Sequence, residues 1–289
     1  MSVVLIPLAT LVDYEYLEST YGDKDVFICD TYVQEAENWE EIEGGYKKGR
    51  YINIDHHAPG ERMSKFVTST CLACDYVKKH GVVGKDSIVL INHTDCDSIL
   101  SSQIMIGFLE PETRYAEASI DSDHTGRENY LADALQSCAY FQNIEKSLEC
   151  LNSVLSKRKM PQDCYFQYKK RLNERQSLAS SVQKGEFKQE GALHYISREK
   201  KVDTALLPAL IPDSIIIGVF SPQGNGNISV SLRLGLNPPP GYHLNQQGFP
   251  DGFCGRWNAG SNTRRVGMSS GGLNPMLGDC FNSIWGTKF

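Results

Sequence analysis

Residues 51–57 read YINIDHH, in which an apolar run ends in an aspartate and two adjacent histidines. The apolar run predicts a β-strand, so Asp55, His56 and His57 are expected where a strand ends and a loop begins. The alternatives are that the triplet caps a turn or that it reaches into a site. A surface patch of charge needs no strand to position it, so the triplet predicts functional side chains.

Three other segments have the same form and are also predicted as strands: DVFICD (25–30), SIVLINH (87–93) and YAEASID (115–121). Each of them ends in an aspartate or a histidine. The stretches between them, TSTCLACDYVKKHG (68–81) and SILSSQIMIGFL (98–109), have the apolar spacing of helices. Strands that alternate with helices predict an α/β fold, with a mostly parallel sheet and helices on both of its faces.

The second half of the chain changes character twice. Residues 129–189 have the periodic apolar positions of helices, and strand patterns return near residue 190. We therefore predict a catalytic domain with a helical connector over residues 1–187 and a smaller C-terminal α+β domain over residues 188–289. The strands predicted for the second domain lie in ALHYISRE (192–199), DSIIIGVF (213–220) and NISVSLRLG (227–235).

Size and charge restrict the class of protein. The chain has 289 residues, of which 40% are hydrophobic and 22% are charged, as in a globular protein with a core. No apolar run approaches the ~18–20 residues that span a bilayer, so no membrane association is expected. The net charge of −6 provides no basic field of the kind that dominates the binding of long nucleic acids.

The cysteines and the N-terminus bear on location. Nine cysteines, an odd number, lie mostly in apolar or motif contexts, which predicts reduced thiols and a cytoplasmic location. The apolar residues near the N-terminus follow no basic region, so a secretory signal is not expected. Cys71 and Cys74 form a CxxC pair, but no second pair follows at zinc-finger spacing, and we expect no structural zinc there.

Acids and histidines gather at the ends of the four predicted strands. In a parallel α/β sheet the carboxyl ends of the strands lie along one edge, and ligands bind outside that edge. Carboxylate and imidazole ligands together suit Mn²⁺ or Mg²⁺, and so many acids would repel one another without a cation. A single aspartate at a strand end is more often a turn former or a helix cap, but four coincidences predict a metal site. The side chains concerned are Asp30, Asp55, His56, His57, His93, Asp95, Asp97, Asp121, Asp123 and His124.

A site of this composition predicts phosphoryl chemistry. Two divalent ions roughly 3.5–4 Å apart can hold both sides of an in-line displacement at phosphorus. A carboxylate with two oxygens can bridge the two ions. A histidine that binds neither ion could orient the phosphate or protonate the leaving oxygen.

Over most of residues 25–130 the motifs resemble those of the DHH phosphoesterase superfamily. Its members include exonucleases, oligoribonucleases, cyclic-dinucleotide phosphodiesterases, exopolyphosphatases and manganese-dependent pyrophosphatases. Asp55-His56-His57 is similar to the triplet that names the family, and Thr68-Ser69-Thr70 to the hydroxyl-rich segment that follows it. Three further matches are His93-Thr94-Asp95-Cys96-Asp97 with the HxDxD motif, Asp30 with the isolated bridging aspartate, and Asp123-His124-Thr125-Gly126 with the fourth motif.

The resemblance implies two Mn²⁺ ions, with Mg²⁺ as the alternative. The implied ligands are His93 and Asp95 for the first ion, His56, Asp97 and Asp123 for the second, and Asp30 for both. His57 would contact the scissile phosphate, and Asp55 would orient the histidines. Asp121 is the alternative to Asp123, because His124 leaves the register of the fourth motif open.

The C-terminal segment is similar to the substrate-binding domain associated with DHH proteins. SVSLRLG (229–235) resembles its Ser-x-Arg strand, and CGRWNAGS (254–261) lies where the family has a Gly-Gly-His segment. Glycines let the backbone approach a phosphate, and arginines pair with its oxygens. Trp257 offers a ring for a base to stack on, with simple packing as the alternative. The substrate-binding residues expected here are Arg233, Gly255, Arg256, Asn258, Gly260, Arg264 and Arg265.

One departure from the family concerns the order of the motifs. The HxDxD segment normally precedes the bridging aspartate and the triplet, whereas here it follows both. This order predicts a permuted sheet or a strand recruited from elsewhere in the chain.

The sequence thus predicts a two-metal phosphohydrolase that cleaves terminal phosphodiester bonds of short oligonucleotides or dinucleotides. The alternatives are an exopolyphosphatase or pyrophosphatase, and a non-catalytic nucleotide-binding regulator. The expected partners are a small phosphorylated substrate and, in a homodimer, a second copy of the chain.

Overall fold

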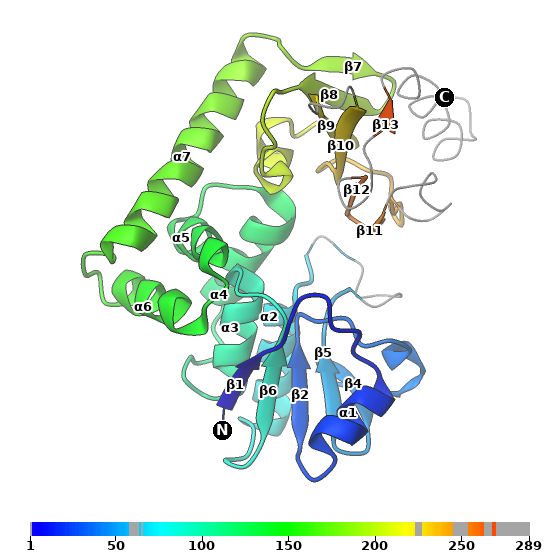
Figure 1. Ribbon diagram of the computed structural model, residues 1–289, viewed down its shortest axis with the longest axis vertical. Coiled ribbons are helices and arrows are strands. Elements are labelled where there is room, and N and C mark those ends of the chain that lie inside the picture. The colour runs from blue at the N-terminus through cyan, green and yellow to red at the C-terminus, as the bar shows by residue number, and fades with distance from the viewer. Residues whose placement is uncertain are drawn as a thin grey trace. The chain divides into compact units, whose positions relative to one another are not determined.

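The computed structural model describes residues 2–57, 64, 66–222, 227–244, 254–262 and 268–269 (Figure 1). Contacts between residues divide the chain into two units. The first unit comprises Met1–Asp123 and Glu128–Leu172, and the second comprises His124–Arg127 and Asn173–Phe289. The division falls inside a long helix, whereas the predicted domain boundary at residue 187 follows that helix and stays a prediction.

The first unit contains a six-stranded sheet in the order β1-β6-β2-β5-β4-β3. The first four strands in this order are parallel, whereas β4 is antiparallel to both of its neighbours, β5 and β3. The predicted α/β fold with a mostly parallel sheet is therefore confirmed, while the edge strand β1 and the β3–β4 hairpin were not predicted. The strands are β1 (Ser2–Leu5), β2 (Val26–Cys29), β3 (Glu40–Ile42), β4 (Gly45–Lys48), β5 (Tyr51–Ile54) and β6 (Ile88–Ile91).

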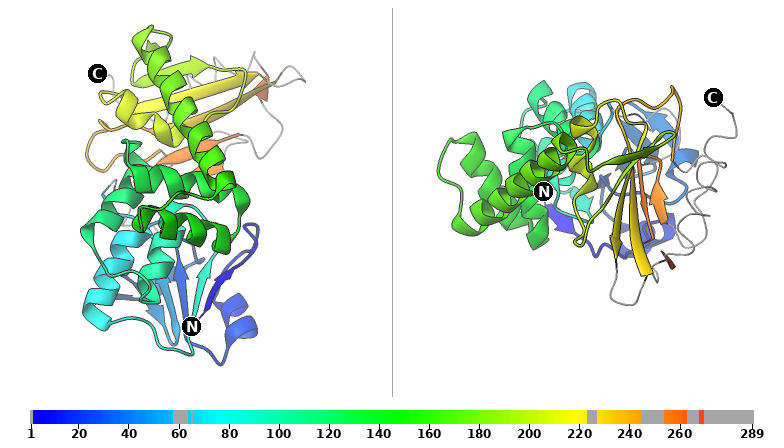
Figure 2. Two further views of the ribbon diagram at one scale, coloured as in Figure 1. Left: turned by 90° about the vertical axis from the view of Figure 1, so that its left-hand side faces the viewer. Right: turned by 90° about the horizontal axis from the view of Figure 1, so that it is seen from above.

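Helices cover both faces of this sheet, as the left view of Figure 2 shows. Successive residues of a strand point to opposite faces, so each strand contributes to two cores. In β2, Phe27 and Cys29 pack in the core formed with α2 and α3, whereas Val26 and Ile28 pack in the core formed with α1. The helices concerned are α1 (Tyr14–Tyr21), α2 (Ser69–His80) and α3 (Cys96–Met105).

The fourth predicted strand, at residues 115–121, is wrong. This segment forms the helix α4 (Thr113–Ile120), which continues into a π-helical turn, η2 (Asp121–Thr125). Its buried residues are Tyr115, Ala118 and Ser119, and their spacing of three and four is that of a helix. Asp121 and Asp123 therefore follow the end of a helix, whereas the other predicted ligands follow three neighbouring strands.

Residues 129–189 are largely helical, as predicted. Asn129 and Asn143 cap the N-termini of α5 and α6, since each side chain accepts a hydrogen bond from a backbone amide of the first turn. The elements are α5 (Tyr130–Cys138), η3 (Ala139–Phe141), α6 (Ile144–Leu155) and α7 (Gln162–Gln183). Among the described residues, no helix combines the length and the apolar character that crossing a membrane requires.

The second unit is built on a seven-stranded sheet in the order β11-β12-β10-β9-β8-β7, in which β13 pairs with β10. Neighbouring strands are antiparallel except for β8 and β9, which are parallel. Figure 2 shows the strands of this sheet side by side. Leu178 of α7 packs with Ile196 and Ile217 of the sheet. The three strands predicted here are confirmed as β8 (Leu193–Ser197), β9 (Ile216–Pro222) and β10 (Asn227–Leu234), and the others are β7 (Lys188–Glu190), β11 (Cys254–Arg256), β12 (Ala259–Ser261) and β13 (Met268–Ser269).

Candidate metal centre

Asp30 stands at the carboxyl end of β2 in an unusual backbone conformation. Its φ of 48° is left-handed, a region that aspartate and asparagine tolerate better than most residues. The side chain is buried and its two oxygens are held separately. The Ser69 hydroxyl donates to Oδ1 at 3.3 Å, and the Ser98 hydroxyl donates to Oδ2 at 2.7 Å. The carboxylate is therefore fixed in one orientation.

The two oxygens of Asp30 face two different groups of side chains. Oδ2 lies 3.2 Å from Nε2 of His93, which in turn lies 3.1 Å from Oδ2 of Asp95. Oδ1 lies 3.6 Å from Nε2 of His56 and 3.8 Å from Nδ1 of His57. In each group the potential ligand atoms lie within 4.8 Å of one another. A carboxylate that offers one oxygen to each of two groups has the arrangement that can bridge two cations.

Two more carboxylates approach the second group. Nε2 of His56 lies 3.4 Å from Oδ2 of Asp123 and 3.7 Å from Oδ2 of Asp97. Asp121 is engaged elsewhere, because its Oδ2 accepts a hydrogen bond from Asn129 at 3.0 Å. The wide turn of η2 thus brings Asp123, and not Asp121, beside the triplet. Such π-helical turns occur frequently at functional sites.

Asp97 also links the N-termini of two helices. It lies in the first turn of α3, and its Oδ1 accepts from the amide of Thr70 at 2.8 Å and from the Thr70 hydroxyl at 2.6 Å. Its Oδ2 accepts from the amide of Ser69 at 2.8 Å. Both amides belong to the first turn of α2, which Thr68 caps, and have no acceptor within the helix itself. The hydroxyl-rich segment that resembles the family's motif therefore orients the carboxylates of the site.

Asp55 is fully buried and contacts His57. Its Oδ1 lies 2.6 Å from Nδ1 of His57, and its Oδ2 accepts the backbone amide of the same residue at 3.0 Å. A carboxylate on one ring nitrogen fixes the orientation of the imidazole and keeps a proton on that nitrogen. This geometry suits the orienting role that the resemblance implies for Asp55.

The electrostatics of the cluster favour bound positive charge. Burial opposes the charge of Asp30, but the field of His93 and the hydrogen bond with His56 outweigh it and hold the pKa of Asp30 well below its ordinary value. Burial also opposes a charge on His56, yet Asp30, Asp123 and Asp97 raise the pKa of His56 to about 9. Burial and the charge of Asp30 raise the pKa of Asp97 to about 8. A divalent ion can take the place of these protons.

The donor set fits the ions that the resemblance implies. Each group around Asp30 combines carboxylate oxygens with imidazole nitrogens, the ligands that suit Mn²⁺ and, less selectively, Mg²⁺. Cys29 and Cys96 lie next to the acids in the sequence, but their thiols are buried. Burial and the neighbouring acids raise the pKa of both thiols well above the ordinary value, so they stay protonated.

The predicted substrate-binding residues lie partly in the second sheet. Arg233 is buried in β10, and Gly255 pairs with Gly260 across β11 and β12. The backbone of Arg256 belongs to β11. Arg264 and Arg265 lie outside the described residues. The structure therefore brings Gly255 and Gly260 side by side, and the roles expected for these residues stay predictions.

Asn258 and Trp257 pack within the second unit. Nδ2 of Asn258 lies 3.1 Å from Nδ1 of His124, and both residues are buried. The buried ring of Trp257 lies 5.5 Å, centroid to centroid, from the rings of His124 and of His243. Packing, the alternative to base stacking for Trp257, is what this unit shows.

Two functional features were missed by sequence reasoning. Ser98 was not singled out, although a hydroxyl directly after the HxDxD segment was a visible signal. The need for glycine at position 126 was also missed. Gly126 has a φ of +67°, and a Cβ there would lie 2.2 Å from the carbonyl oxygen of Ala205. Backbone geometry therefore requires the glycine of the segment that resembles the fourth motif.

No protein-family model matches the chain, and no curated protein matches it. Among solved structures it is similar to a pGpG-specific phosphodiesterase, PggH, from Vibrio cholerae. The TM-score is 0.48 and the identity 10%, over 72% of this chain and 87% of that chain. Such a similarity assigns no activity, substrate or site residue here. By the motifs at Asp55-His56-His57 and His93–Asp97, and by the convergence of their side chains on Asp30, the chain resembles the DHH phosphoesterase superfamily.

Proposed function

We propose that the chain is a divalent-metal-dependent phosphohydrolase that cleaves terminal phosphodiester bonds of short oligonucleotides or dinucleotides. The observation that carries this proposal is the placement of Asp30. Its Oδ2 faces His93 while its Oδ1 faces His56, so one buried carboxylate serves both groups of ligands. Two ions held by these residues would supply the positive charge that an in-line displacement at phosphorus requires.

Six side chains of the first unit would hold these ions. His93 and Asp95 would bind one ion, and His56 with Asp97 and Asp123 the other, with Asp30 shared. The hydroxyl groups of Ser69, Ser98 and Thr70 fix the orientation of the two buried carboxylates, Asp30 and Asp97. Ligands that are already oriented lose little freedom when the ions bind.

His57 is the residue proposed to act on the substrate. Asp55 holds a proton on its Nδ1, which leaves Nε2 as the atom that contacts a phosphate oxygen or the leaving oxygen. The Asp55 carboxylate also stabilises the charge that appears on the ring when Nε2 gains a proton. The pair would thus supply general acid–base catalysis beside the two ions.

The second unit is proposed to recognise the rest of the substrate. Gly255 and Gly260 would let the backbone approach a phosphate, and Asn258, Arg233, Arg256, Arg264 and Arg265 would contact its oxygens. The net charge of −6 disfavours long duplexes, so a substrate of a few phosphates is expected. The packed ring of Trp257 favours the second candidate, hydrolysis of pyrophosphate or short polyphosphate, because that reaction needs no base platform.

A substrate panel with added Mn²⁺ tests the proposal. It would contain a 3–5-residue oligonucleotide, a linear dinucleotide, 3′,5′-bisphosphoadenosine, pyrophosphate and short polyphosphate. Mn²⁺-dependent turnover of the nucleotides alone supports the proposed function, and turnover of the inorganic phosphates alone supports the second candidate. No turnover by metal-loaded protein contradicts both and favours a nucleotide-binding regulator.

A further inference from the structure

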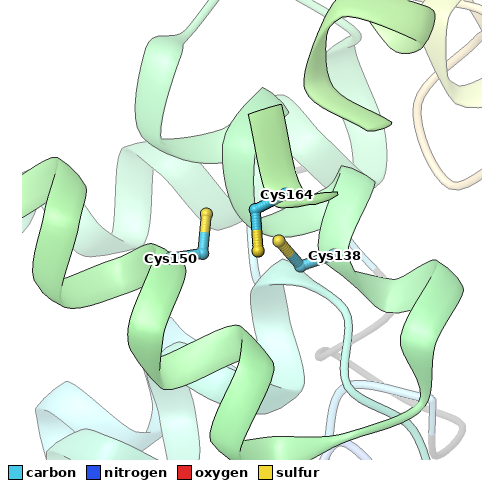
Figure 3. A group of neighbouring side chains, drawn as sticks. All are labelled: Cys138, Cys150 and Cys164. Carbon is cyan, nitrogen blue, oxygen red and sulfur yellow. The ribbon is translucent and has the colours of Figure 1, made fainter. Parts of the chain in front are cut away.

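Three cysteines from three separate helices converge in the first unit. Cys138 is the last residue of α5, Cys150 lies in α6, and Cys164 lies in the first turns of α7. All three are fully buried, and their sulfur atoms lie within 4.8 Å of one another. Figure 3 shows the three side chains gathered between these helices. They are remote in sequence from the metal-centre motifs and take no part in the proposed reaction.

The surroundings of the three thiols are mostly apolar. Ala134 and Met160 pack against them in the same core cluster. The thiol of Cys150 donates to the carbonyl oxygen of Ala134 at 3.7 Å, and that of Cys164 to the carbonyl oxygen of Lys146 at 3.9 Å. Both contacts are long and weak, so neither would hold a thiol against a stronger partner. Simple packing of small apolar residues is the alternative explanation for this cluster.

We propose that Cys138, Cys150 and Cys164 form a site for one soft divalent cation of the Zn²⁺ type, bound by three thiolates. Sulfur atoms held about 2.3 Å from one ion lie roughly 3.8–4.0 Å apart. The observed limit of 4.8 Å means that closing the site needs shifts of at most about 1 Å, which small rotations of the side chains supply. The ion would connect α5, α6 and α7.

The charge balance selects the kind of ion. Three thiolates leave a net charge of −1 with a divalent ion and −2 with a monovalent ion, and buried net charge is costly. Sulfur ligands favour Zn²⁺ over Mn²⁺ or Mg²⁺, which prefer oxygen. The site is therefore chemically distinct from the carboxylate and imidazole centre around Asp30, and the two would select different ions.

Binding at this site exchanges protons for the ion. Burial raises the pKa of Cys164 to about 12, and the hydrogen bond with Cys150, together with burial, raises the pKa of Cys138. The metal-free thiols of Cys138 and Cys164 therefore stay protonated at neutral pH. Each thiol that becomes a ligand releases one proton to solvent, so binding tightens as the pH rises.

The test uses Co²⁺ as the probe, added to the full-length, fully reduced, chelator-treated protein. Thiolate-bound Co²⁺ absorbs in the near ultraviolet through sulfur-to-metal charge transfer, a band that carboxylate and imidazole ligands do not produce. We expect the band to rise to a plateau, to disappear in Cys150→Ala, and to be displaced by added Zn²⁺. The matched control is Cys74→Ala, which removes a buried cysteine outside the cluster and should keep the band.

A second variant and a thermal measurement separate loss of the site from loss of the fold. Cys164→Ser keeps the size of the side chain and should show a wild-type circular dichroism spectrum without the band. Zn²⁺ should raise the unfolding temperature of the wild type more than that of either cluster variant, because the centre around Asp30 is the same in all three proteins. A folded, reduced wild type without the band overturns the proposal, as does an undiminished band in Cys150→Ala. A disulfide between two of these cysteines in protein purified without reductant, together with no band after reduction, also overturns it.

Discussion

Replacing Asp30 by asparagine is the sharpest perturbation of the proposed metal centre. Asparagine is nearly isosteric with aspartate and tolerates the left-handed φ of 48°, where alanine would be strained. Its amide group can still interact with the hydroxyls of Ser69 and Ser98, which now donate to the carboxylate. The change therefore removes the negative charge and one of the two ligand oxygens while it keeps the shape of the site.

The expected effects follow from that shared carboxylate. Losing the bridge between two ions should remove several kcal/mol of stabilisation of the transition state. With about 4 kcal/mol lost and 1.36 kcal/mol per factor of ten, kcat/KM should fall roughly a thousandfold or more. Each ion present at 100 times its Kd stabilises the folded state by about 2.7 kcal/mol, or roughly 5–10 °C in the unfolding temperature. This metal-induced shift should largely disappear in Asp30→Asn.

The assay compares each variant with and without Mn²⁺, so that its metal-free stability serves as its own reference. Mn²⁺ binding measured by titration calorimetry, the thermal shift and the initial hydrolysis rate should all fall together. Asp86→Asn, an exposed carboxylate of the first unit, is the matched control and should match the wild type. Near-wild-type hydrolysis by Asp30→Asn with two ions still bound would refute the bridging role.

Three further predictions follow from the same geometry. Asp123→Asn should weaken Mn²⁺ binding at least tenfold by calorimetry and Asp121→Asn should not, since of these two carboxylates Asp123 lies beside His56 and Asp121 contacts Asn129. Equal effects of the two substitutions would contradict the assignment. Gly126→Ala should lower the free energy of unfolding in urea by roughly 2–4 kcal/mol, because a Cβ there would lie 2.2 Å from a backbone oxygen. Gly185 has the same φ but no atom near the position of a Cβ, so Gly185→Ala should lower it less. The metal-free protein should lose stability as the pH rises from about 6.5 to about 9, because the raised pKa of His56 makes its protonated form stabilising below that range. Thermal unfolding with chelator should show this loss and Mn²⁺-loaded protein should not; a flat profile with chelator would count against it.

Much of the first unit could be predicted from the sequence because its parallel strands are short, largely apolar and bounded by polar residues. In β2 and β5 every residue is buried, and a candidate site residue, Asp30 or Asp55, follows each strand directly. Thr68 and Gly81 flank α2 as capping signals, so that helix was predicted nearly to the residue. Local pattern and tertiary environment agree in these segments.

The segment before Asp121 misled the prediction because its ending resembled that of the true strands. The spacing of Tyr115, Ala118 and Ser119 carried the helical signal, but the acids that follow suggested a fourth strand end. No local pattern predicts the π-helical turn, in which the side chain of Asp121 contacts Asn129 and that of Asp123 contacts His56. The sequence likewise does not predict the cluster of Cys138, Cys150 and Cys164, because the cluster depends on how three helices pack.

The departure in motif order has a simple physical resolution in the sheet. β6, which leads into His93 and the HxDxD segment, lies directly beside β2, which leads into Asp30, and both run in the same direction as β5 before the triplet. Ligands carried by adjacent parallel strands meet at one edge whatever the order in which the chain forms those strands. The helices that follow β5 and β6 are α2 and α3, and Asp97 joins their N-termini by accepting the amides of Ser69 and Thr70. Because the positive ends of two helix dipoles then face Asp97, they offset part of the cost of burying its charge. The order of the motifs can therefore change without loss of the site, provided that β2, β5 and β6 remain neighbours.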